Sequence, residues 1–138
     1  MRRVRLTRRY RFPAAHVLAS NVLSEAENRR IFGSCANPNG HGHDYAVEVS
    51  VEGSVDPESG RVVSLEVLDG IFDAEVRERY SHRMLNEVAR FETRVPTAEN
   101  IALAIFDDLT SRVAKRTGAR LTNVRVVETS NNHFDVGA

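Results

Sequence analysis

One stretch limits what this chain can fold into more than any other. In residues 33–45, histidine alternates with glycine at His41-Gly42-His43, and the stretch leads directly into residues 45–51, where apolar and polar side chains alternate. Such alternation is typical of a β-strand with one buried face. Side chains two residues apart in a strand point to the same face, so a strand that begins at His41 places both imidazoles on its apolar side. The sequence therefore predicts half of a metal site on an apolar sheet face.

A third histidine continues the apolar side of an earlier strand. In residues 3–12, arginines occupy odd-numbered positions, and apolar side chains occupy the even-numbered ones apart from Arg8. This alternation predicts a strand with one solvated face. Residues 12–16 extend the apolar parity to His16, and Pro13 either weakens the strand or places it at a sheet edge. A lone inward histidine is usually a hydrogen-bonded core residue, and a row of arginines is usually a solvated face. Because the other histidine pair also faces inward, His16 becomes a candidate third ligand.

The order of the elements predicts the fold class. Alternating segments predict strands, and apolar residues at helical spacing after a capping residue predict helices. The expected strands are residues 3–12, 44–54 (with residues 61–63 extending its pairing), 120–129 and 133–136; the expected helices begin at the caps Ser24, Ser64 and Thr97 and run to Gly33, Tyr80 and Gly118. Apart from the short first helix, the order is β-β-α-α-β-β. This order favours an α+β fold with two helices on one face of an antiparallel sheet.

Composition narrows the classes of function. The 19 basic and 19 acidic residues give a formal net charge of zero, which argues against a nucleic-acid partner. The length of 138 residues predicts a single domain, residues 1–138. No apolar run approaches the ~18 residues that span a bilayer, so no membrane partner is expected. The one cysteine excludes an intramolecular disulfide and, without a signal-peptide pattern, indicates a reducing, cytoplasmic setting.

Three histidines with one open position form one of the ligand sets of catalytic zinc. We predict that His16, His41 and His43 are this set. Cys35 has three interpretations: an inert small residue, a fourth closing ligand, or a thiolate that acts as a base. The turn at residues 37–40 lets the chain double back, so Cys35 is expected near the histidines. Its polar, turn-rich surroundings favour the base.

Two further residues are candidates for chemistry. Glu128 falls on the apolar parity of residues 120–129, and a buried carboxylate must be paired because burying a bare charge is costly. Its partner is either an arginine or backbone amides, or a ligand with two adjacent N–H donors such as a pterin or guanine. His82 lies in residues 81–86, which break the preceding helix, and is a candidate acid or base, although such a histidine alone is more often a surface residue.

Four motifs, taken in order, resemble the family of 6-pyruvoyltetrahydropterin and 6-carboxytetrahydropterin synthases. They are residues 12–18, 35–45, 96–100 and 127–129. The resemblance spans nearly the whole chain. Five residues separate Cys35 from His41, which is similar to the tetrahydrobiopterin-type synthases, whereas the 6-carboxy relatives of queuosine biosynthesis usually have three.

The resemblance implies a fold, an assembly and a set of site residues. The fold is the tunnelling fold, in which a trimer closes its sheets into a barrel, two trimers stack into a homohexamer, and active sites lie at subunit interfaces. The implied residues are His16, His41 and His43 for zinc; Cys35 as the proton-abstracting base, His82 as its relay partner and Glu128 as the pterin anchor for catalysis; and Glu128, Thr97 and Glu99 for substrate binding.

The resemblance also implies a reaction. The substrate is 7,8-dihydroneopterin triphosphate, and the product is 6-pyruvoyltetrahydropterin, formed by internal redox of the side chain with loss of triphosphate. Such an enzyme is a carbon–oxygen lyase of tetrahydrobiopterin biosynthesis. In this reaction zinc polarises the side-chain oxygens so that carbon-bound protons can be removed.

Two positions depart from the family pattern. Ser81 stands where the family normally has the aspartate immediately before the relay histidine, and Ser64 stands where it commonly has aspartate or asparagine. Serine can hydrogen-bond an imidazole but does not supply the charge that favours imidazolium. By analogy with losing an orienting aspartate in a hydrolase triad, the rate falls by orders of magnitude. Ser81 therefore leaves three alternatives open: a 6-carboxytetrahydropterin synthase, a dihydroneopterin-aldolase-like enzyme, and a weakly catalytic zinc- and pterin-binding module.

Overall fold

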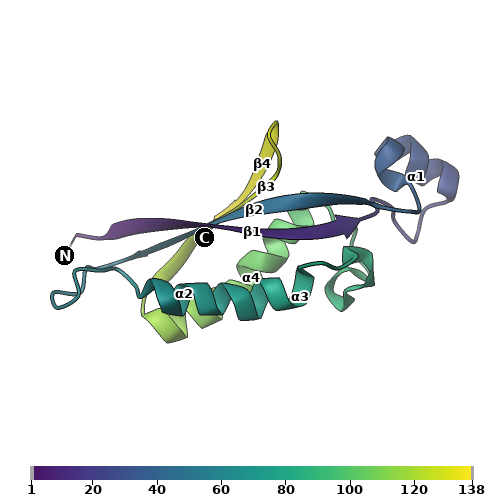
Figure 1. The fold of residues 1–138 in the computed structure, drawn as a ribbon. Coiled ribbons are helices and arrows are strands. Elements are labelled where there is room, and N and C mark those ends of the chain that lie inside the picture. Colours follow the sequence, from purple (N-terminus) through teal and green to yellow (C-terminus); the bar gives the residue numbers. More distant parts are fainter. Residues whose placement is uncertain (1, 138) are drawn as a thin grey trace.

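The structure, a computed structural model, describes residues 2–137 and is built on one four-stranded antiparallel sheet (Figure 1). The strands are β1 (Val4–His16), β2 (His41–Gly53), β3 (Arg120–Thr129) and β4 (Asn132–Gly137). Their order across the sheet follows the sequence, so β1 and β4 are the two edges. All four predicted strands are confirmed, and β2 begins at His41 as the histidine pair requires.

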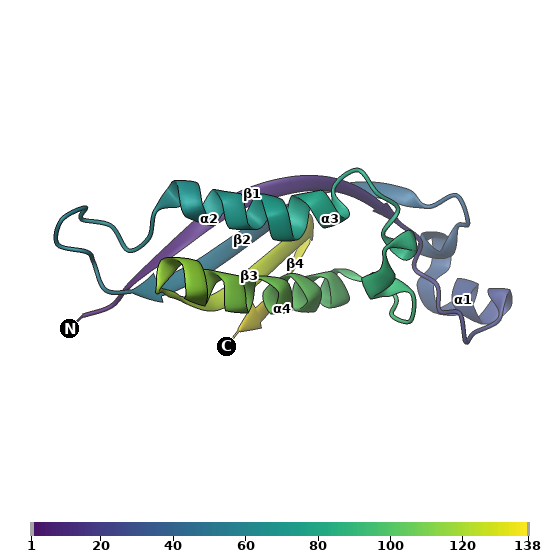
Figure 2. The same ribbon diagram turned by 90° about the horizontal axis from the view of Figure 1, so that it is seen from below.

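Two long helical segments cover one face of the sheet. The first is a continuous rod made of α2 (Leu65–Phe72), a π-helical turn (Asp73–Arg77) and α3 (Glu78–Tyr80). The second, α4 (Ala98–Thr117), runs beside it under the sheet (Figure 2). The predicted α+β arrangement, with two helices on one face, is confirmed.

The shorter helices lie at one end of the molecule. Helix α1 (Glu25–Phe32) projects beyond the end of the sheet, and a 3₁₀ turn (Gly33–Ala36) follows it (Figure 1). Two more 3₁₀ turns, Leu85–Glu87 and Ala89–Phe91, lie between α3 and α4. No helix within residues 2–137 is both long and apolar enough to cross a membrane.

Each predicted capping residue starts its helix. The Ser24 hydroxyl accepts from the Glu27 N–H and the Glu27 carboxylate accepts from the Ser24 N–H, which completes a capping box. The Ser64 and Thr97 hydroxyls accept from backbone N–H groups three residues on, at 3.3 and 3.2 Å. Gly118 ends α4 at φ +73°, a left-handed conformation that glycine adopts without strain. These boundaries are local, so they were readable from the sequence.

The core lies between the sheet and the two helical segments. Along β1, the side chains of Tyr10, Phe12, Ala14 and His16 are all buried, which confirms the inward parity. The rings of Tyr10 and Phe72 stack with centroids 4.0 Å apart and so join β1 to α2. Burying one such aromatic side chain contributes about 1.5–3 kcal/mol. The apolar parity that fixes the core therefore carries His16 into the interior as well.

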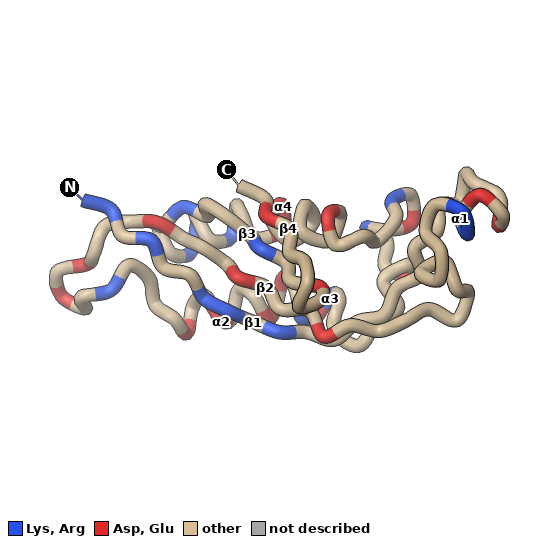
Figure 3. The backbone as a smooth tube through the Cα atoms, turned by 90° about the horizontal axis from the view of Figure 1, so that it is seen from above, with Lys and Arg blue, Asp and Glu red and all other residues tan. Residues whose placement is uncertain are grey.

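The opposite face of the sheet is charged and solvated. Figure 3 shows basic residues along β1 next to acidic residues of β2. Ion pairs join the arginines of β1 to the acids of β2: Arg5 to Glu52 at 3.6 Å, Arg9 to Glu48 at 3.4 Å and Arg11 to Asp44 at 3.7 Å. The arginine row is thus a solvated, charge-balanced strand face. Arg8, which breaks the parity, turns to the helix side and donates to both carboxylate oxygens of Asp69 in α2, at 3.0 and 2.9 Å.

Two expectations need correction. Residues 61–63 do not extend β2. The Arg61 carbonyl accepts from the Asp56 N–H at 2.9 Å, which closes a turn, and residues 62–63 form a bend. The helix from Ser64 to Tyr80 is continuous but not regular. In its π turn the Glu78 N–H bonds to the Asp73 carbonyl, five residues back, which a helical stripe of apolar residues does not reveal.

Candidate metal centre

Three imidazoles meet where β1 ends and β2 begins. The register pairs His16 directly with His41 and places His43 opposite Ala14. One nitrogen from each histidine lies within 4.8 Å of the others. The Nε2 atoms of His16 and His41 are 2.8 Å apart. The structure therefore brings together the three histidines that the strand patterns selected.

His16 is held in one orientation by its surroundings. Its Nδ1 lies 2.8 Å from the Pro96 carbonyl, and because a carbonyl only accepts, Nδ1 carries the proton. The Tyr45 hydroxyl lies 3.2 Å from the same nitrogen. This leaves the Nε2 lone pair of His16 directed at the cluster, which is the arrangement of a histidine metal ligand with an outer hydrogen-bond partner.

Burial favours the neutral form of two of the three imidazoles, His16 and His41. The side chain of His16 is fully buried, and this burial lowers its pKa to about 4. The pKa of His41 is lowered as well, first by burial and then by the neighbouring His43. Neutral imidazole is the form that binds a metal, so burial of His16 and His41 favours the protonation state that a metal site requires.

Glu128 stands at the edge of the histidine cluster. Its Oε2 lies 3.9 Å from Nε2 of His16, and its side chain is 17% exposed. The β3–β4 register shifts between Val127 and Thr129, so Glu128 sits at an irregularity of the kind that re-aims a side chain. Within residues 2–137 no arginine lies within ion-pair distance of its carboxylate. Of the partners considered for Glu128, an arginine is therefore excluded within this single chain.

The segment before α4 contacts the cluster at His16. Pro96 supplies the carbonyl that binds His16, and the next residue, Thr97, caps α4. Thr97 is half-buried there, whereas Glu99 in the first turn of α4 is exposed. Of this predicted pair, Thr97 thus lies next in sequence to a residue in contact with the cluster, and Glu99 points to solvent in the single chain.

His82 lies on the outer edge of β1. Its N–H donates to the Pro13 carbonyl at 2.7 Å. Proline is tolerated in β1 because β1 is an edge strand, and the outward-facing carbonyl of Pro13 is available to accept this bond. His82 lines one shallow hollow together with His43 and Asp44. The predicted break after Tyr80 is confirmed, and it places His82 close to one of the three histidines.

Cys35 lies apart from the histidine cluster in the single chain. It is half-buried in the 3₁₀ turn Gly33–Ala36, and its carbonyl accepts from the Leu18 N–H at 2.8 Å. Among residues 2–137, the group close enough to share one metal ion consists of the three histidines without Cys35 or Glu128. A closing fourth ligand from Cys35 of the same chain therefore has no support.

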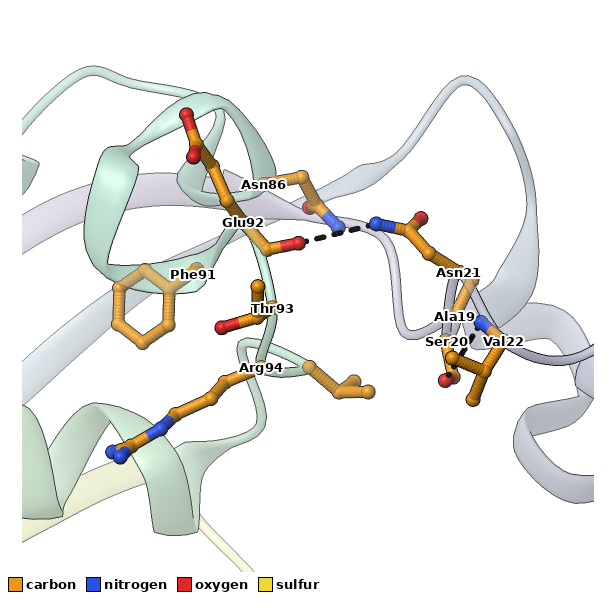
Figure 4. Close-up of a pocket in the computed structure, with 10 residues that line it drawn as sticks. Ala19, Ser20, Asn21, Val22, Asn86, Phe91, Glu92, Thr93 and Arg94 are labelled. Carbon is orange, nitrogen blue, oxygen red and sulfur yellow. Dashed lines mark hydrogen bonds between the residues drawn. The ribbon is translucent and has the colours of Figure 1, made fainter.

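A cavity of about 240 Å³ lies between residues 19–22 and residues 91–95 (Figure 4). The Asn21 side chain crosses it to donate to the Glu92 carbonyl at 3.1 Å. Asn86 also lines it and bonds both backbone groups of Val17, at 2.8 and 2.9 Å. Sequence patterns gave no signal for Asn86, because an asparagine in a loop has no periodic context, yet it anchors the residue that follows His16.

A four-stranded antiparallel sheet with two helices on one face and a three-histidine cluster at one end defines a protein of the tunnelling-fold class. The model of the 6-pyruvoyl tetrahydropterin synthase family matches residues 5–138. The chain therefore belongs to the 6-pyruvoyl tetrahydropterin synthase family.

Similar proteins agree with this assignment. A 6-pyruvoyl tetrahydrobiopterin synthase of Homo sapiens is 40% identical over 128 residues, which cover 92% of this chain and 86% of the relative. One of Poecilia reticulata is 39% identical over 129 residues, with 92% and 85% covered. The solved structure of the 6-pyruvoyl tetrahydropterin synthase of Caenorhabditis elegans superposes with a TM-score of 0.90 at 38% identity, covering 100% of this chain and 97% of that one.

Proposed function

We propose that this protein is a zinc-dependent enzyme of tetrahydrobiopterin biosynthesis that converts 7,8-dihydroneopterin triphosphate to 6-pyruvoyltetrahydropterin with loss of triphosphate. The observation that carries the proposal is the position of Glu128, whose Oε2 lies 3.9 Å from Nε2 of His16 in the three-histidine cluster. A carboxylate there can accept two adjacent N–H donors of a pterin while the cluster holds a metal. The names of the similar proteins support the 6-pyruvoyl product over the 6-carboxy one.

Zinc fits the donor set. Three imidazole nitrogens with an open fourth position match the ligand set of catalytic zinc. We assign His16, His41 and His43 to the metal, with His16 oriented by the Pro96 carbonyl. When bound, zinc supplies a Lewis acid that polarises the oxygens of the substrate side chain.

The remaining steps fall to side chains of the protein. Glu128 binds the N–H edge of the pterin and fixes the ring so that its side chain reaches the histidine cluster. Cys35, as thiolate, removes a carbon-bound proton of that side chain, and His82 takes the proton from the thiol and returns one to the product. Thr97 and Glu99 contribute substrate contacts at the start of α4. No external oxidant is required. The first side-chain carbon is oxidised to a carbonyl while a C=N bond of the pterin ring is reduced. The second becomes a carbonyl as the C–O bond of the third carbon breaks, triphosphate leaves, and that third carbon is reduced to a methyl group.

The assembly completes this site. Among residues 2–137 no further strand lies beside β1 or β4. Residues 82–84 bond to the end of β1 only, and an unpaired strand edge is a template for pairing with another copy. We propose that edge pairing closes a trimeric barrel, that two trimers form a homohexamer, and that Cys35 meets the histidine cluster at a subunit interface. Residues 1–138 then act as one pterin-synthase-like domain, and a cytoplasmic, reducing setting keeps the single thiol active.

The test is turnover by zinc-loaded protein supplied with 7,8-dihydroneopterin triphosphate. Triphosphate release and a 6-pyruvoyltetrahydropterin product identified by mass are expected. Glu128→Gln is expected to lower kcat/KM by about 10- to 100-fold, since a charge-assisted hydrogen bond contributes about 1.5–3 kcal/mol. His133→Gln is the matched control, because that histidine is exposed on β4, outside the cluster.

Three outcomes would contradict the proposal. If the zinc-loaded protein releases no triphosphate, the remaining alternative is a weakly catalytic module that binds zinc and pterin. A 6-carboxy product would identify the second synthase type, and cleavage of the side chain without redox would identify an aldolase-like reaction. Product mass separates the last two.

A further inference from the structure

A buried carboxylate outside the histidine cluster has no role in the proposed reaction. It is Asp108 of α4, whose side chain is 4% exposed. The Tyr80 hydroxyl donates to its Oδ2 at 2.7 Å, the Arg79 guanidinium lies 3.3 Å from its Oδ1, and Arg90 donates to the same oxygen. A carboxylate this deep is tolerated because three donors satisfy it.

The partners of Asp108 enclose one segment of the chain. Tyr80 is the last residue of α3, and Arg90 lies in the 3₁₀ turn Ala89–Phe91. Residues 81–89 lie between them, and this segment carries His82. The Tyr80 ring is buried against Phe12 of β1 and Phe91, with centroids 6.4 and 5.9 Å away. Asp108 therefore fastens both ends of the His82 segment to α4.

The backbone at His82 needs such support. His82 has φ +59°, a left-handed conformation that non-glycine residues adopt infrequently and that persists where neighbouring contacts fix it. On the β1 side, the His82 N–H bonds to the Pro13 carbonyl and the Ala15 N–H bonds to the Arg83 carbonyl, at 2.7 and 2.9 Å. On the helix side, the fixed point is Tyr80, two residues earlier, held by Asp108. The segment is thus held from both layers of the fold.

We propose that Asp108 is a positioning residue for His82: through Tyr80 and Arg90 it fixes residues 81–89, so that the His82 imidazole keeps its place in the hollow beside His43. The inference rests on the proposed role of His82 in proton transfer. Asp108 touches neither substrate nor metal ligands, and it acts through the backbone that it anchors. Ser81 supplies no carboxylate to hold the imidazole, so the orientation of His82 depends on this anchoring.

A neighbouring carboxylate offers a matched control. Glu75 in the π turn is 12% exposed, and it pairs with Arg79 at 2.8 Å and with Arg112 of α4 at 3.2 Å. It joins the same two helical segments as Asp108 but has no ion pair with residues 81–90 among those described. Glu75 and Asp108 share the partner Arg79, but Glu75→Gln leaves Tyr80 and Arg90 bonded to Asp108. The variant therefore perturbs helix packing and buried charge without releasing the His82 segment.

The experiment compares Asp108→Asn, Tyr80→Phe and Glu75→Gln in the full zinc-loaded chain. Four quantities are measured: kcat, KM, zinc affinity and the hydrogen exchange rates of the amides of residues 82–86. Asp108→Asn and Tyr80→Phe are expected to lower kcat by about 10- to 100-fold, since a displacement near 1 Å costs about 100-fold. KM and zinc affinity are expected to change less than about twofold, and exchange at residues 82–86 is expected to accelerate at least about tenfold.

Several results would overturn the inference. Unchanged exchange at residues 82–86 in both variants would show that Asp108 does not fix the segment, whether or not the wild type turns over substrate. Accelerated exchange with unchanged kcat would show that His82 does not need the anchor. If Glu75→Gln loses as much kcat as Asp108→Asn, the loss would reflect a general decrease in stability and not the position of His82. If the wild type has no turnover, the proposed reaction fails, and accelerated exchange still supports the anchoring. Tyr80→Phe removes one hydroxyl, so it keeps the test open if Asp108→Asn does not fold.

Discussion

Removing one histidine of the cluster gives the sharpest quantitative prediction, and His41→Ala is the suitable change. His41 is half-buried, unlike the fully buried His16, so its truncation leaves the core intact. Tetrahedral zinc at about 2.0–2.1 Å from each nitrogen places the ligand nitrogens about 3.3–3.4 Å apart. The nitrogens of the cluster lie within 4.8 Å of one another, with one pair at 2.8 Å, so zinc requires only small side-chain movements.

The magnitude follows from the number of ligands. Structural zinc sites with four ligands bind with about 10–16 kcal/mol, or roughly 3 kcal/mol per ligand, so losing one histidine weakens Kd by about 100-fold. Zinc at about 100 times the wild-type Kd stabilises the wild type by about 2.7 kcal/mol, which raises Tm by roughly 10 °C for a chain of this size. The same zinc concentration is close to the Kd of His41→Ala, so zinc raises the Tm of this variant by less than about 2 °C.

The assay is a thermal melt of each protein with and without zinc, together with calorimetric titration for Kd. His133→Ala removes an exposed histidine on β4 and is expected to behave like the wild type. The reasoning fails if His41→Ala keeps the wild-type Kd, or if His133→Ala loses as much affinity. A stoichiometry below one zinc per chain would also count against a site built from one copy of the three histidines.

Three further predictions test other parts of the structure. Ser81→Asp is expected to raise kcat by tenfold or more, because a carboxylate beside His82 favours imidazolium, and an unchanged rate would show that Ser81 does not limit proton transfer. Asp69→Asn is expected to lower the free energy of unfolding by about 0.5–1 kcal/mol at pH 7 by urea titration, after allowing for solvent screening. Because the hydrogen bond from Arg8 holds the pKa of Asp69 below its ordinary value of 3.8, this difference is expected to shrink as pH falls below about 4, and a constant difference would refute the pairing. Gly40→Ala is expected to destabilise the fold by about 1–2 kcal/mol, since φ is +75°, a conformation that is strained for alanine, whereas the Met84 methyl group near the added Cβ can move aside; an unchanged Tm would refute it.

Much of the candidate site was readable from local patterns. The i, i+2 spacing of His41 and His43 fixes their shared face in any strand, and the parity of β1 carries His16 to the same side. The apolar parity of β3 likewise marked Glu128 as a carboxylate in need of a partner. Helix boundaries followed from Ser24, whose capping box requires residues only three positions apart. These features depend on near neighbours in the chain, so sequence spacing determines them.

Features that depend on distant segments were not readable. The carbonyl that orients His16 belongs to Pro96, 80 residues away, and Asp108 lies 28 residues from the tyrosine that it binds. The π turn inside the expected helix also escaped the patterns, because one extra residue in a turn leaves the apolar stripe unchanged. The patterns likewise did not show that residues 61–63 stay unpaired with β2.

By itself, the sequence determined which side chains face the core, where the helices begin, and that three histidines share one apolar surface, because strand and helix periods act over a few residues. Tertiary structure alone decided that Glu128 stands 3.9 Å from His16, that Cys35 lies outside the cluster of its own chain, and that Asp108 holds the His82 segment. Distances of this kind are set by how the two layers pack against each other, and packing joins residues whose separation in the chain carries no periodic signal.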